Sequence, residues 1–124
     1  MTAQWLLTLN IALFVLHEMD GVRRMEWRMV FPINRLPDET AHNVFCSLHL
    51  PLFGLLFWML TWPAGQVTFW LKATFDGFLV FHLGLHLIFL KHPENRFTSL
   101  FSRALIVAMA LGGIWHAILT LPIS

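Results

Sequence analysis

The stretch VTFWLKATFDGFLVFHLGLHLIFL (67–90) is followed directly by the polar segment KHPENR (91–96). The first stretch is almost free of charge and is long enough to cross ~30 Å of hydrocarbon at about 1.5 Å per residue. Pro93 ends a helix here because its ring cannot continue the backbone hydrogen-bond ladder. The stretch therefore predicts a transmembrane helix that stops at a polar turn.

Three further apolar segments of similar length complete the chain. Together with the first one, the four predicted segments run over residues 3–22, 39–62, 67–90 and 97–121. Backbone groups in lipid must be satisfied internally, which favours helices, and the alternation that a membrane barrel needs is missing. Short turns at 62–66 and 91–96 make neighbouring helices antiparallel. We therefore expect an all-α, integral membrane, antiparallel four-helix bundle that forms a single domain over residues 1–124.

The composition agrees with a protein that lies in a lipid bilayer. Hydrophobic residues make up 57% of the chain and charged residues 12%, against about 25% in soluble domains. The mean hydropathy is +0.67. A net charge of only +1 excludes a basic surface for nucleic acid, and the single cysteine excludes an intramolecular disulfide.

The basic residues predict the orientation in the membrane. Seven of them, Arg23, Arg24, Arg28, Arg35, Lys91, Arg96 and Arg103, lie in or near the first and third connections. Both of these connections are on one side of the bundle, whereas the opposite side has only Lys72. Because basic residues collect on the cytoplasmic side, both termini are expected on the non-cytoplasmic side.

Four of the seven histidines are expected at a similar depth in the cytoplasmic half of the membrane. Counting along each helix at about 1.5 Å per residue puts them ~7–15 Å below the surface. They are His17, His49, His82 and His86. An ionisable side chain inside a membrane indicates a functional site. We therefore expect three helices to contribute to one polar site.

The spacing of these histidines favours a metal site. His82 and His86 are four residues apart and share one helix face, which is how one helix offers two imidazoles to one metal ion. We predict His17, His49, His82 and His86 as the candidate ligands of a divalent metal, Zn²⁺ or non-haem Fe²⁺.

Two carboxylates lie beside His17 at the end of the first helix. Glu18 and Asp20 are the candidate catalytic residues, as a general acid or base, with a metal ligand or a partner that orients a histidine as other possible roles. A simple ion pair between Asp20 and Arg24 is the alternative for Asp20. In the third helix, Asp76 is expected to pair with Lys72, four residues before it.

Three stretches of the chain resemble a family of small bacterial multi-pass membrane proteins of uncharacterised function. The stretches are LFVLHEMDGVRRMEWR (13–28), LHLPLFGLLFW (48–58) and FHLGLHLIFL (81–90). The resemblance implies a location in the bacterial inner membrane, but no activity. It also implies a shared polar site built on His17, Glu18, Asp20, Glu26, His49, His82 and His86.

These observations favour a membrane-embedded metal-binding protein, with a metal-dependent enzyme acting on a lipid-like substrate as one form of it. Whether the site is catalytic stays open. The alternative is a small accessory subunit of a larger membrane complex, or a homo-oligomer, with histidines that are structural or bind haem or a pigment. A proton pathway is disfavoured because the polar residues gather in one half of the membrane.

Overall fold

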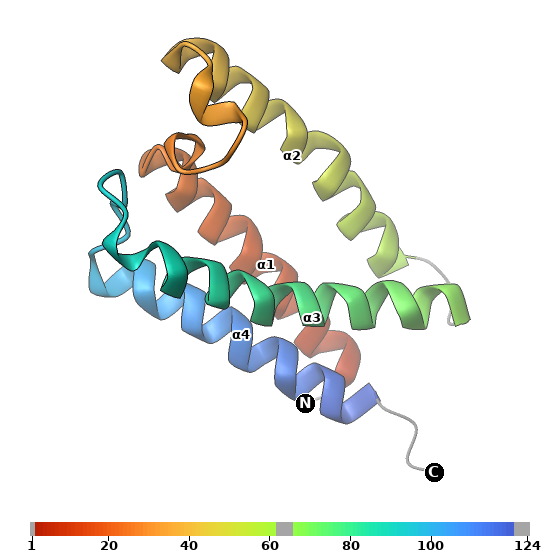
Figure 1. Cartoon of the computed structure of the whole chain (residues 1–124). Helices are drawn as coiled ribbons and strands as arrows, with labels where there is room; N and C mark the ends of the chain where they lie inside the picture. Colours follow the sequence, from red (N-terminus) through yellow and green to blue (C-terminus); the bar gives the residue numbers. More distant parts are fainter. Residues whose placement is uncertain (1, 62–65, 121–124) are drawn as a thin grey trace.

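The computed structural model describes residues 2–61 and 66–120 and folds them into four α-helices linked by turns and short 3₁₀ helices (Figure 1). The α-helices are α1 (Ala3–Arg23), α2 (Asp38–Thr61), α3 (Gln66–Ile88) and α4 (Leu100–Thr120). The predicted all-α bundle is confirmed. The turn expected at 62–66 and the helix ends expected at 62 and 121 lie wholly or partly outside the described residues.

Each of the four helices is long and apolar enough to cross a membrane. Their outer faces carry large apolar side chains, such as Leu50, Ile88 and Leu100, that are more than two-thirds exposed. An apolar surface of this extent on a soluble chain would drive association, whereas lipid covers it without cost. The four helices and this exposed apolar surface therefore fit an integral membrane protein.

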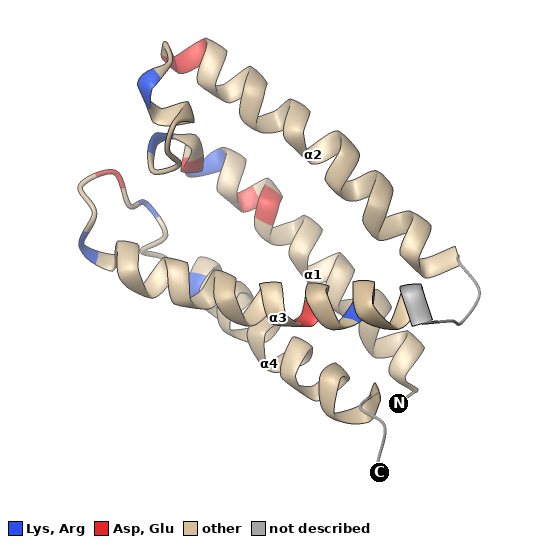
Figure 2. Cartoon of the chain, turned by 45° about the vertical axis from the view of Figure 1, so that its right-hand side comes forward, with Lys and Arg blue, Asp and Glu red and all other residues tan. Residues whose placement is uncertain are grey.

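Charged residues gather at one end of the bundle, around the connection from α1 to α2 and the connection from α3 to α4 (Figure 2). Away from this end, α3 carries one basic and one acidic residue, Lys72 and Asp76. The distribution matches the asymmetry on which the predicted orientation rests.

The order of the helices around the bundle brings side chains of α1 and α3 to its centre. α4 packs along both α1 and α3, while α2 contacts α1 and, more sparsely, α3. The helix α2 diverges from α3 with distance from the segment that joins them (Figures 1 and 2). In the described part of the chain α1 and α3 have no close backbone contact, so they meet only through side chains. A polar side chain on either helix that points inward therefore lies in the middle of the protein.

The connection between α1 and α2 is a folded cap rather than a loose loop. Met25 adopts a left-handed conformation with φ 58°, which reverses the chain after α1. The next residues form the 3₁₀ helix Glu26–Arg28, and a second 3₁₀ helix covers Ile33–Arg35. Trp27 donates its indole N–H to Asp38 at the start of α2 over 2.9 Å. These turns hold Glu26 against the end of the bundle.

A second polar group lies in the other half of the bundle. Asp76 accepts a hydrogen bond from Nδ1 of His116 at 2.6 Å, and both side chains are almost fully buried. The expected partner, Lys72, forms no ion pair within the described residues, so a tertiary contact between α3 and α4 replaces the predicted pair within α3. Asn10 of α1 is also fully buried, beside Gly112 of α4.

Candidate metal centre

Three histidines from two helices meet at the centre of the bundle. Nε2 of His17 in α1 lies 2.8 Å from Nε2 of His82 in α3, and Nε2 of His86 lies 3.2 Å from the same atom. One turn of α3 separates the two α3 histidines, so both rings face α1. All three side chains are buried.

Aromatic rings enclose the three imidazoles. The ring of Phe97, which follows the polar turn before α4, lies 4.6 Å from the ring of His86 and 5.6 Å from that of His17, measured between centroids. Phe14 and Phe78 contact His82 from the core side. The enclosure limits access of water, which strengthens electrostatic interactions inside the cluster.

Glu26 completes a group of four possible ligands. Its carboxylate lies 3.7 Å from Nε2 of His86, and the ligand atoms of His17, Glu26, His82 and His86 all lie within 4.8 Å of one another. The carboxylate is buried, and its Oε2 atom has no hydrogen-bond partner among the described residues. Burial and the nearby Glu18 raise the pKa of Glu26 to about 8, because both disfavour the charged form.

A glycine makes room for this carboxylate. A Cβ atom at Gly21 of α1 would collide with Oε2 of Glu26. The reversal of the chain at Met25 and the bare backbone at Gly21 together allow a residue outside α1 to fold back against it. Both features position Glu26 over the histidines.

The donor set and its spacing fit a divalent metal ion. A neutral imidazole nitrogen either donates one proton or offers one lone pair, so hydrogen bonds among the three Nε2 atoms leave His17 and His86 competing for the single Nε2 atom of His82. A cation accepts all three lone pairs. Ligands at about 2.0–2.1 Å around tetrahedral Zn²⁺ are roughly 3.3–3.4 Å apart, a value that lies within the range of 2.8–3.7 Å between neighbouring atoms of His17, His82, His86 and Glu26.

His49, the fourth predicted ligand, lies apart from this group and pairs with Glu18. Its Nε2 atom is 2.6 Å from Oε2 of Glu18, and its Nδ1 atom is 2.7 Å from the carbonyl oxygen of Phe45. Both ring nitrogens face oxygen acceptors, so the pair shares one proton in addition to the one that Nδ1 donates. Glu18 and His49 line a separate pocket of about 180 Å³ between α1 and α2.

Asp20, the second predicted catalytic carboxylate, connects α1 to α4. One of its oxygens accepts a hydrogen bond from Ser102, and the other lies 3.3 Å from Nε of Arg24. Arg24 also donates to the hydroxyl of Ser99, which lies 2.8 Å from the hydroxyl of Ser102. The four side chains form a closed ring of polar contacts that joins the end of α1 to the start of α4.

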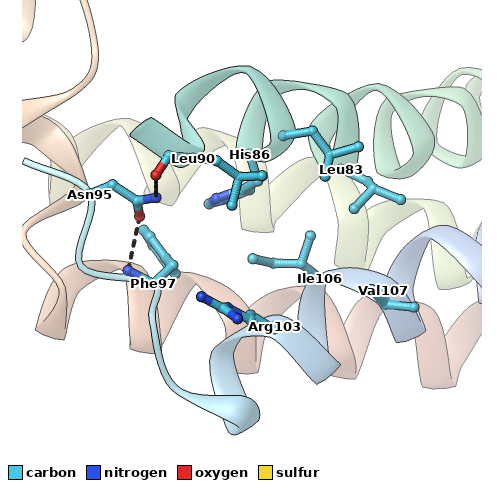
Figure 3. A pocket seen from close by; sticks show the side chains of 9 residues that line it. Leu83, His86, Leu90, Asn95, Phe97, Arg103, Ile106 and Val107 are labelled. Carbon is cyan, nitrogen blue, oxygen red and sulfur yellow. Dashed lines mark hydrogen bonds between the residues drawn. The ribbon is translucent and has the colours of Figure 1, made fainter. Parts of the chain in front are cut away.

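Two pockets adjoin the histidines, and His86 lines both. The larger, of about 380 Å³, opens between α3 and α4 (Figure 3). The smaller, of about 190 Å³, is lined by Glu26, His82 and His86 together with apolar residues of the first connection and α3. Both pockets therefore reach a proposed part of the centre at His86.

The sequence placed His17, His82 and His86 at one level, and the structure brings these three together. It does not bring His49 into contact with them, because α2 packs against α1 at the position of Glu18. Glu26 was not predicted as a ligand, since it follows the arginines that mark the end of α1. The resemblance was the one signal that included it in the polar site.

The comparisons with known proteins give a family without an activity. The model of the Family of unknown function (DUF6713) matches residues 3–122, which include every residue of the centre. No curated protein and no solved structure matches the chain. The expected relation to an uncharacterised family is confirmed.

Proposed function

We propose that this chain, which belongs to the DUF6713 family of unknown function, is a membrane-embedded protein that binds one divalent metal ion at its centre. The proposed ligands are His17, His82, His86 and Glu26. His49 lies outside this set and is paired with Glu18.

One observation carries the proposal: the Nε2 atoms of three buried histidines from α1 and α3 lie within hydrogen-bond distance of one another at the centre of the bundle. Burying three imidazoles at this spacing is unfavourable unless something binds their lone pairs. The buried carboxylate of Glu26 adds the negative charge that a divalent cation requires in a medium of low dielectric. Gly21 supports the same conclusion, since it keeps space for that carboxylate.

The ligand set favours Zn²⁺ or non-haem Fe²⁺. Imidazole and carboxylate ligands suit both ions. Four protein ligands fill the tetrahedral shell of Zn²⁺, whereas six-coordinate Fe²⁺ would keep two positions for other molecules. Identification of the bound metal therefore also distinguishes a structural centre from a catalytic one.

The surroundings favour catalysis on a lipid-like substrate. A bound metal ion would supply Lewis acidity toward a polar group of such a substrate. His86, a proposed ligand, lines the pocket between α3 and α4, so a substrate in that pocket would lie next to the centre. The pair of Glu18 and His49 is the candidate for proton transfer, because its two side chains share one proton and line a pocket of their own between α1 and α2. Asp20, with both oxygens engaged, fits a positioning role.

The proposed location is the bacterial inner membrane, with both termini on the non-cytoplasmic side. The gathering of basic residues at the two connections supports this orientation. The metal centre then lies in the cytoplasmic half of the membrane.

Elemental analysis of the protein purified in detergent, together with its absorption spectrum, tests the proposal. We expect about one equivalent of Zn or Fe per chain, no Soret band, and loss of the metal in His82→Ala. A Soret band would instead support the alternative of an accessory subunit that binds haem. Absence of any metal, with a folded His82→Ala variant that behaves like the wild type, would rule out the metal centre.

A further inference from the structure

The pocket between α3 and α4 has a polar end and an apolar end (Figure 3). Arg103 and Asn95 lie at the polar end, close to where α3 ends and α4 begins. Leu83 and Val107 lie at the other end, further along the two helices. A lipid that enters from the same side of the membrane has the same arrangement, with its headgroup near the surface and its chain toward the bilayer centre.

Arg103 supplies a positive charge that the protein does not neutralise. Among the described residues its guanidinium forms no ion pair or side-chain hydrogen bond, whereas Arg24, Arg28 and Arg96 each pair with a carboxylate. Its neighbours Leu100 and Phe101 are exposed apolar residues that face lipid.

Arg103 also lies at an electrostatically unfavourable place in its helix. It lies in the first turn of α4, where the helix dipole is positive and a cation is disfavoured. The helix end and the guanidinium therefore both attract an anion to the same end of the pocket. Asn95 is neutral, and its amide is already engaged with the carbonyl oxygen of Leu90 and the N–H of Phe97, so it does not compete for the guanidinium.

We propose that this pocket binds a single-chain amphiphile with an anionic oxygen headgroup, a phosphate or carboxylate, taken from the bilayer. Arg103 holds the headgroup, and the first part of the chain lies against Leu83, Leu87 and Val107. The guanidinium offers the planar pair of N–H groups that oxyanions bind.

The size and opening of the pocket select a single chain. Its volume of about 380 Å³ is at the lower end of the range of small-molecule sites, roughly 300–1,000 Å³. Leu87, Leu90 and Val107 at its rim are about half exposed, so the rest of the chain can stay in lipid. His86 forms part of the wall, which puts the head-proximal part of the chain beside the centre; the assignment of this molecule as a substrate rests on the proposed function.

Binding of radiolabelled dodecyl phosphate to the full chain in phosphatidylcholine nanodiscs tests the proposal, with empty nanodiscs as the background. We expect saturable binding to the wild type and about tenfold weaker binding to Arg103→Gln, because one charge-assisted contact is lost. Lys91→Gln is the matched control, since Lys91 is an exposed cation at the same end of the bundle but outside the pocket. It should bind like the wild type. Equal binding by wild type and Arg103→Gln would overturn the proposal.

Two further probes separate the parts of the ligand. If dodecanol binds as tightly as dodecyl phosphate, the anionic headgroup does not contribute to binding. If inorganic phosphate binds as tightly as dodecyl phosphate, the alkyl chain does not contribute. Either result overturns the proposal. Leu87→Trp, which places a larger side chain at the rim of the pocket, should weaken binding of dodecyl phosphate although Arg103 is still present.

The metal content of the same samples separates this proposal from the proposed function. Arg103→Gln should keep its metal, because Arg103 touches no proposed ligand atom. If the purified wild type contains no metal but its binding of dodecyl phosphate depends on Arg103, the metal centre is overturned and the amphiphile site is supported. Metal in the wild type, with binding that does not depend on Arg103, would overturn the amphiphile site alone.

Discussion

Replacement of Gly21 by alanine has two opposite effects that the structure separates. Alanine in a helix interior is more favourable than glycine by about 1 kcal/mol, so helix propensity alone predicts a more stable α1. The added Cβ, however, takes the position of the Glu26 carboxylate. Because this carboxylate is the end of a flexible side chain, it can move away without unfolding the protein. We therefore expect Gly21→Ala to fold but to bind metal more weakly.

The size of the effect follows from what Glu26 contributes to the centre. Loss of a group that supports a metal typically lowers affinity 10–100-fold, or by about 1.4–2.7 kcal/mol, and loss of a proposed ligand should cost at least as much. The loss exceeds the gain in helix propensity, so the metal-loaded variant should be less stable than the metal-loaded wild type. Without metal the order should reverse.

Competition with a chromophoric chelator measures the affinity, and thermal denaturation with and without metal measures the stability. Gly84→Ala is the matched control, because Gly84 lies in α3 between His82 and His86 and a Cβ there meets no atom within 4 Å. It should keep the affinity of the wild type. Metal affinity of Gly21→Ala within twofold of the wild type would refute the role of Glu26.

Three other variants test separate parts of the structure. Asp76→Asn leaves the buried His116 without its carboxylate and should lower the free energy of unfolding by about 3–5 kcal/mol with no change in metal content; an unchanged denaturation temperature would contradict the buried pair. Asp20→Asn weakens the contact with Ser102 and should cost about 1–3 kcal/mol in thermal stability while metal binding persists; lost activity at unchanged stability would instead make Asp20 catalytic. With a pKa of about 8, Glu26 in the metal-free protein holds a proton that the unfolded chain releases. The free energy of unfolding, measured in the presence of a chelator, should therefore fall as the pH rises from about 6.5 to 8. Glu26→Gln should remove this pH dependence in denaturation scans.

The helices could be predicted from the sequence because each depends on local properties. An apolar run long enough to cross a bilayer must form a helix, whatever it packs against. The depth of a histidine also follows from counting residues along its helix, which is why His17, His82 and His86 were expected at one level. These inferences need no knowledge of neighbouring helices.

The partners across the bundle could not be predicted, because they depend on which faces meet. His49 has a depth similar to that of the other histidines, but its face of α2 meets Glu18 instead. Asp76 has a basic residue one turn away in sequence, yet the contact with His116 from α4 forms in its place. Tertiary packing decided both cases.

The position of Glu26 depends on a reversal of the backbone that the residue types in this segment do not predict. A left-handed residue after a helix is usually glycine or asparagine, whereas here it is Met25. Read from the sequence, Glu26 is a juxtamembrane charge. The glycine that accommodates it lies five positions earlier, at Gly21, and is ordinary within an apolar helix.

X-ray absorption at the metal edge tests the central claim most directly, on protein loaded with one equivalent of Zn²⁺ or Fe²⁺ and then freed of unbound metal. The proposed centre predicts three imidazole nitrogens and one carboxylate oxygen at about 2.0–2.2 Å, with fewer imidazoles in His82→Ala. A spectrum with water oxygens alone or with a sulfur ligand, or a protein that retains no metal, would contradict a metal centre built on His17, His82, His86 and Glu26.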